Sequence, residues 1–203
     1  MNFLAHLHLA DHCRSHLAGN LLADFVRGDP DRVYSREVAN GIRLHRFVDS
    51  YIDAMPEVLR CRELFSPQTR RVSGIALDIT WDHFLARHWQ RYHALPLAAF
   101  VNDAHAKVTA YRGAAPEAYH LTMARMWQQQ WLLQYQDVDT IQMALERMAN
   151  RRPRLYQLAH CPADILRHYN QLEQQFFRIY PQLIEAAGTF RAQQDDSSSP
   201  SQS

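Results

Sequence analysis

Apolar residues recur at helical spacing over long stretches of this chain, and this pattern constrains the fold more than any other feature. Val38, Ile42, Val48 and Ile52, for example, fall on one face of a helix. The 203 residues include only 6 Gly and 9 Pro, which is few for an all-β fold with many turns. Strand-like alternation is never sustained over several strand lengths. The sequence therefore predicts an all-α, single-domain helical bundle.

The same spacing places the individual helices between the helix breakers. Gly19 is expected to interrupt the pattern, and Asn20 to cap the helix that follows it. The chain end is polar and Ser-rich and offers nothing to bury, which is typical of disorder. We therefore predict a helical domain at 1–191, a disordered tail at 192–203, and helices at 2–12, 21–27, 35–53, 56–65, 68–92, 96–113, 117–135, 137–149 and 162–187.

Charge and hydropathy exclude several classes of protein. The formal net charge is +1, so no overall signature of nucleic-acid binding exists. No apolar run approaches the ~18 residues of a membrane span, and the N-terminal run, broken by His6 and His8, is no signal peptide. Cys13, Cys61 and Cys161 are too widely spaced for a zinc or disulfide pattern. Free thiols and a cytoplasmic location are expected.

Acidic residues inside apolar helical patterns are candidate metal ligands. Asp24 lies in the apolar run 21–26, where burying a carboxylate is costly unless it is paired or bound to a cation. Asp78 and Asp82 share one helical face and should repel each other, and a shared cation would cancel that repulsion. His83 adjoins this pair. A solvent-facing Asp24 is the alternative interpretation.

Histidines supply the second kind of candidate ligand. His45 and Asp49 are four residues apart and lie on one helical face, although a structural hydrogen bond or a solvated face would give the same spacing. His6 lies in an apolar stretch, where a hydrogen-bonded core histidine is the alternative. Imidazole and carboxylate ligands without paired cysteines suit Mn, Mg or Fe more than structural zinc. Such a metal could support phosphodiester hydrolysis.

Other catalytic templates are absent from the sequence. It contains no Gly-x-Ser-x-Gly elbow, phosphate-binding P-loop, dinucleotide fingerprint or His-Glu-x-x-His helix. The residues alone leave two hypotheses about function open. One is a helical metal-dependent phosphohydrolase that acts on a nucleotide or another small phosphodiester, and the other is a helical interaction module with a buried His–Asp network.

Several motifs of the chain resemble the acyl carrier protein phosphodiesterase family. They are residues 1–7, 19–28, 41–49, 78–85 and 148–155, and the similarity extends over about 1–187. The resemblance implies a helical fold related to HD-type phosphohydrolases and dependence on Mn²⁺, with Mg²⁺ or Fe²⁺ as alternatives. It also implies hydrolysis of the phosphodiester that joins 4'-phosphopantetheine to a serine of holo-acyl carrier protein, which releases the apo-protein and 4'-phosphopantetheine.

The resemblance also assigns roles to individual residues. It gives His6 and Asp49 as further candidates. For the mechanism, we expect Arg46 or Arg27 to offset phosphoryl charge and His6 to handle the proton of the leaving group. The implied catalytic residues are Asp24, His45, His6 and Arg46, and the implied metal ligands are Asp24, His45, Asp78, Asp82 and His83.

The implied partner, holo-acyl carrier protein, is small and strongly acidic, so arginines are expected to bind it. A single exposed arginine is ordinarily only solvated surface, whereas a group near a phosphate site is a reasonable docking patch. No nucleic-acid or membrane partner is expected, and the sequence leaves the oligomeric state open. The predicted partner-binding residues are Arg60, Arg62, Arg70, Arg71, Arg151, Arg152 and Arg154.

Overall fold

Helices make up all regular structure between residues 1 and 196, the part of the chain that the computed structural model describes, and this confirms the all-α prediction. The α-helices are α1 (Phe3–His12), α2 (Leu17–Leu22), α3 (Arg36–Ala54), α4 (Pro56–Glu63), α5 (Ser73–Arg87), α6 (Leu97–Ala110), α7 (Glu117–Gln128), α8 (Trp131–Gln134), α9 (Asp139–Arg151), α10 (Cys161–Arg167) and α11 (Tyr169–Asp196). Short 3₁₀ helices are η1 (Ala23–Phe25), η2 (Pro30–Arg32), η3 (Arg70–Val72), η4 (Trp89–Arg91) and η5 (Pro153–His160).

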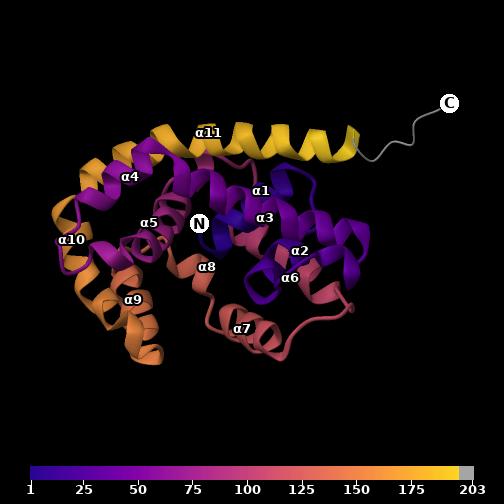
Figure 1. Ribbon diagram of the computed structural model, residues 1–203, viewed down its shortest axis with the longest axis horizontal. Coiled ribbons are helices and arrows are strands. Elements are labelled where there is room, and N and C mark those ends of the chain that lie inside the picture. The colour runs from indigo at the N-terminus through magenta and orange to yellow at the C-terminus, as the bar shows by residue number, and fades with distance from the viewer. Residues whose placement is uncertain (197–203) are drawn as a thin grey trace.

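Two helices, α1 and α5, form the centre of the bundle. Every residue of α1 from Leu4 to Ala10 is buried, because α2, α3, α5 and α11 all pack around it. The long α11 runs along one edge, with α7 and α9 near the opposite edge (Figure 1). Between α5 and α11, the rings of Trp81 and Phe84 pack against Phe176. These aromatic contacts therefore hold α5 against α11.

A close crossing of α2 and α3 depends on two glycines. A Cβ atom on Gly19 would lie 2.6 Å from the carbonyl oxygen of Val38, and one on Gly41 would lie 2.8 Å from that of His16. Gly19 was expected to interrupt the helical pattern, and that prediction was wrong. The helix continues through it because the absent side chain leaves room for α3. His16, not Asn20, caps α2, by accepting a hydrogen bond from the Gly19 amide.

Several predicted helices are divided in the structure. The helix expected at 117–135 separates into α7 and α8 at Gln130, which has a left-handed φ of 51°. The one expected at 162–187 separates into α10 and α11 at His168. The predicted domain boundary at 191/192 falls inside α11, which continues to Asp196. The rest of the predicted tail, 197–203, lies outside the described residues.

The sequence predicts free thiols and no membrane-spanning segment, and the structure can be compared with both predictions. All three cysteines are buried and free of disulfides. Among the described residues, no helix is both long enough and apolar enough to cross a membrane.

Candidate functional site

Three side chains from α1 and α3 meet at the predicted site. His6, His45 and Asp49 each offer one ligand atom, and these atoms all lie within 4.8 Å of one another. The imidazoles of His6 and His45 stack with centroids 3.6 Å apart and an interplanar angle of 14°. Nε2 of His6 is 3.1 Å from Asp49 Oδ1, and Nε2 of His45 is 3.1 Å from Asp49 Oδ2. Asp49 therefore bridges both histidines.

The hydrogen bonding of these histidines fits a metal site. Among the described residues, neither Nδ1 of His6 nor Nδ1 of His45 has a hydrogen-bond partner, and the only polar contact of His6 Nε2 is the ion pair with Asp49. Buried polar atoms are normally paired, so unpaired imidazole nitrogens call for an explanation. Two imidazoles and one carboxylate form a donor set that divalent transition metals favour. The residues present therefore suit a divalent ion.

Two further carboxylates border this triad. Asp24, in the middle of η1, has Oδ1 3.3 Å from Nε2 of His45. Asp78 of α5 accepts a hydrogen bond from the Met1 amine at 2.8 Å, and the same amine lies 3.3 Å from Asp49 Oδ1. The site is therefore a row of acids and imidazoles, with Asp24 at one end and Asp78 at the other.

Burial and charge set the protonation of this row. Burial and the adjacent His45 lower the pKa of His6 to about 4. Burial would also lower the pKa of His45, but hydrogen bonds to Asp24 and Asp49 outweigh it and raise that pKa to about 9. Burial opposes ionisation of Asp24 and Asp49, yet the histidines keep both carboxyl pKa values below normal. Near neutral pH, His6 is neutral and both carboxylates are ionised.

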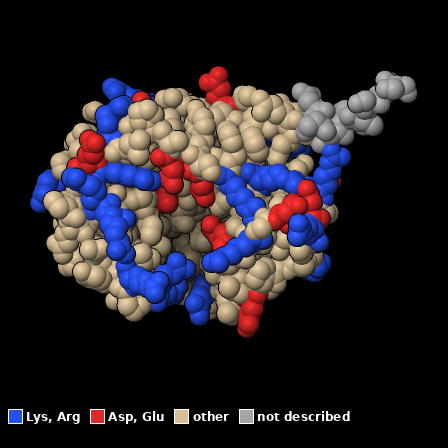
Figure 2. All heavy atoms as spheres, in the orientation of Figure 1, with Lys and Arg blue, Asp and Glu red and all other residues tan. Residues whose placement is uncertain are grey.

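Solvent reaches the triad from its carboxylate side. The side chains of His6 and His45 are 2% and 4% exposed, whereas that of Asp49 is 40% exposed. The N-terminus is marked near the middle of the view in Figure 1. In the same orientation the surface is hollowed there, with acidic side chains beside the hollow and basic ones on both flanks (Figure 2). A phosphorylated ligand could approach the acids only with its charge offset by a cation.

Asp82 and His83, on α5, are not members of the triad. Asp82 is fully buried and accepts hydrogen bonds from the amides of Leu4 and Ala5, and burial raises its pKa to about 7. Both ring nitrogens of His83 have partners, the carbonyl of Tyr135 and the hydroxyl of Tyr169. The carboxylate oxygens of Asp82 and the ring nitrogens of His83 are engaged by these partners, and neither residue belongs to the group of potential metal ligands. Their predicted role as metal ligands stays a prediction.

The side chain of Arg46 is hydrogen-bonded to a neighbouring loop. Its guanidinium donates to the carbonyl oxygens of Gly28 at 2.8 Å and Val26 at 2.9 Å. These bonds hold the segment that follows Asp24. A direct catalytic contact for Arg46 stays a prediction.

The predicted arginine patches adjoin each other. Helix η3, which carries Arg70 and Arg71, packs against η5, which carries Arg154. Arg60 and Arg62 are paired with Glu57 and Asp53, and Arg70 donates to two backbone carbonyls. No ion pair among the described residues involves four exposed arginines, which are Arg71, Arg151, Arg152 and Arg154.

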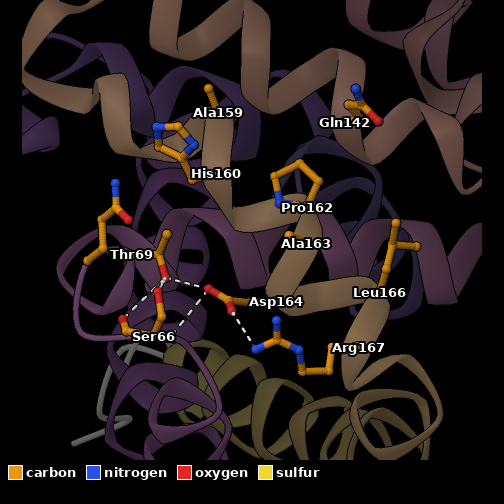
Figure 3. A pocket seen from close by; sticks show the side chains of 11 residues that line it. Ser66, Thr69, Gln142, Ala159, His160, Pro162, Ala163, Asp164, Leu166 and Arg167 are labelled. Carbon is orange, nitrogen blue, oxygen red and sulfur yellow. Dashed lines mark hydrogen bonds and ion pairs between the residues drawn. The ribbon is translucent and has the colours of Figure 1, made fainter.

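A cavity of about 520 Å³ lies apart from the triad, between the 66–69 loop, α9 and α10. Figure 3 shows Asp164 on its wall, directed toward Ser66 and Thr69. Asp164 accepts hydrogen bonds from the Ser66 amide and the Thr69 hydroxyl. This buried acid has a structural role, and the cavity contains none of the predicted catalytic or metal residues.

Sequence reasoning placed Asp49 behind other acids, although the structure puts it at the centre of the triad. The available signal was its spacing of four residues from His45. That spacing could not show that α1 would bring His6 to the same carboxylate. The amine of Met1 was not predicted at all, because nothing in the sequence indicates where a chain end will lie.

Comparisons with known proteins show the family of this chain. The family model described as "Acyl carrier protein phosphodiesterase" matches residues 1–183. Proteins of that name from Salmonella agona, Salmonella newport and Salmonella heidelberg are each 47% identical over 188 residues, or 92% of this chain and 97% of each relative. No solved structure matches significantly. With this family match over nearly the whole helical body, the chain belongs to the acyl carrier protein phosphodiesterase family.

Proposed function

We propose that this protein hydrolyses the phosphodiester between 4'-phosphopantetheine and a serine of holo-acyl carrier protein. In the reaction, a water oxygen forms a bond to phosphorus, and the bond from phosphorus to the serine oxygen breaks. The serine oxygen gains a proton, and phosphopantetheine leaves with its phosphate. The observation that carries the proposal is the His6–His45–Asp49 triad, bordered by carboxylates, in a chain of this family.

His6, His45 and Asp49 would hold the metal, which we propose to be Mn²⁺, with Mg²⁺ or Fe²⁺ as alternatives. A bound divalent ion would polarise a phosphate oxygen and lower the pKa of water. Near pH 7 His6 is neutral rather than an imidazolium acid, and a neutral imidazole offers the unprotonated nitrogen that a metal ligand needs. We therefore favour it as a ligand over its predicted role in proton donation.

Asp24 has the properties of a general base. Its side chain is 50% exposed, so water reaches it, and it remains ionised because His45 lowers its pKa. A base must accept the proton of the attacking water from within hydrogen-bond reach. Arg46 would act through the loop that it holds next to Asp24.

The direct test is mass spectrometry of holo-acyl carrier protein after incubation with the protein and Mn²⁺. The expected result is a mass loss equal to the phosphopantetheine arm, which a chelator prevents and added Mn²⁺ restores. Nucleotide phosphodiesters are the competing substrates. Turnover of those substrates with an unmodified carrier protein would refute the proposed reaction.

The unpaired arginines would bind the acidic surface of the carrier protein. The double variant Arg71→Glu/Arg152→Glu should raise KM at least about 10-fold, because like charges facing each other oppose encounter, and should change kcat much less. Steady-state kinetics at two salt concentrations measures both constants. Arg178→Glu, an exposed residue of α11, is the control. An unchanged KM in the double variant would dismiss this patch.

The reaction, the acyl carrier protein partner and the free buried thiols together fit a cytoplasmic location, which we also propose. Fractionation of cells that produce the protein tests it.

A further inference from the structure

The buried N-terminus of α1 has no cap of its own. The N-cap residue, Asn2, makes no side-chain hydrogen bond to the first turn, and the first turn contains no acidic residue. Leu4 and Ala5 are completely buried, so water cannot satisfy their amides. A buried donor without a partner is destabilising, and this helix end therefore needs a partner from elsewhere in the fold.

Asp82 of α5 supplies that partner. Its Oδ2 accepts from the Leu4 amide at 2.8 Å and its Oδ1 from the Ala5 amide at 3.1 Å. A carboxylate at a helix N-terminus gains from both hydrogen bonds and the helix dipole. Because both oxygens are engaged by successive residues, the contact fixes the first turn of α1 along and around its axis relative to α5.

His6 follows the second of these amides directly. Its ring lies 3.6 Å from that of His45, and its Nε2 lies 3.1 Å from Asp49 Oδ1. A small shift or rotation of the first turn of α1 would therefore move His6 out of the triad.

We propose that Asp82 is a positioning residue, which holds α1 so that His6 faces His45 and Asp49, and not a metal ligand. The inference rests on the metal-binding role proposed above for His6. The position of Asp82 also shows that an acidic residue inside an apolar helix does not require a bound cation. Here the buried carboxylate is satisfied by backbone amides.

The test compares Asp82→Asn with Asp164→Asn. Asparagine at position 82 can accept only one of the two hydrogen bonds and places a donor against the other amide. We expect the His6 ring resonances of the metal-free protein to shift in NMR spectra. We also expect Mn²⁺ affinity, measured by calorimetry, to fall about 10- to 100-fold, as when an outer partner of a metal ligand is lost.

Asp164 is the matched control, because it is a buried acid that also accepts a backbone amide hydrogen bond, but outside the triad. Asp164→Asn should lower Tm while leaving the His6 resonances and Mn²⁺ affinity unchanged. If Asp82→Asn does not fold, Asp82→Glu keeps the charge but lengthens the side chain, and it should weaken Mn²⁺ binding by displacing α1.

Wild-type His6 resonances and Mn²⁺ affinity in a folded variant at position 82 would overturn the positioning role. An equal loss of affinity in Asp164→Asn would do the same. These measurements involve no turnover. Failure of the wild-type protein to act on holo-acyl carrier protein would therefore refute the proposed reaction while leaving this inference intact.

Discussion

Replacing Asp49 by asparagine should abolish measurable Mn²⁺ binding and reduce kcat/KM by more than about 100-fold, the upper range for losing only an outer partner of a metal ligand. Asp49 contacts both His6 and His45 through separate oxygens. Asparagine removes the negative charge and one of the two acceptor oxygens. Calorimetric titration with Mn²⁺ and steady-state kinetics with holo-acyl carrier protein measure the two effects.

The control for this variant is Asp53→Asn, one turn further along α3. Asp53 is exposed and pairs with Arg62 at 2.6 Å, outside the triad. It carries the same charge on the same helix, so its replacement should change neither Mn²⁺ affinity nor kcat/KM appreciably. Normal Mn²⁺ affinity in Asp49→Asn, with helical circular dichroism intact, would remove Asp49 from the site.

Gly19→Ala should destabilise the protein and reduce its activity together. The new Cβ atom would lie 2.6 Å from the Val38 carbonyl oxygen, so the backbones of α2 and α3 must separate. Overpacking of this kind costs about 1–3 kcal/mol, and each kcal/mol lowers Tm by about 2–4 °C in a chain of this size. Because α2 leads directly into η1, the shift should also move Asp24 away from His45. Calorimetric melting and kinetics measure both effects.

Gly188→Ala provides the matched control. Gly188 lies inside α11, and a Cβ atom there meets nothing within 4 Å. Alanine should therefore stabilise the helix by about 0.5–1 kcal/mol and leave activity unchanged. If Gly19→Ala melted at or above the wild-type temperature, the close crossing would not constrain the fold.

Some of the helices themselves could be predicted closely. The expected 2–12 and 35–53 correspond closely to α1 and α3, because one buried face repeats at the helical period. Divisions such as that at Gln130 were missed, since its left-handed φ breaks the helix without glycine or proline. Gly19 was misread because its role depends on a neighbouring helix and not on local conformation.

For the site, sequence spacing placed His45 and Asp49 on one face of α3, and the structure confirms that they are in contact. Asp24, Asp78 and Asp82 were treated alike, as acids inside apolar helices. The structure distinguishes them. Asp24 lies against His45, Asp78 holds the Met1 amine, and Asp82 caps α1.

The amino-acid sequence by itself determined the helical class of this protein, the one-turn spacing of His45 and Asp49, and its family. Only the tertiary structure decided that His6 joins those two residues and that Asp82 faces backbone amides. The reason is physical. Helical periodicity fixes which side chains are neighbours within one helix, whereas contacts between helices depend on how α1, α3 and α5 pack, and that packing depends on side chains throughout the bundle.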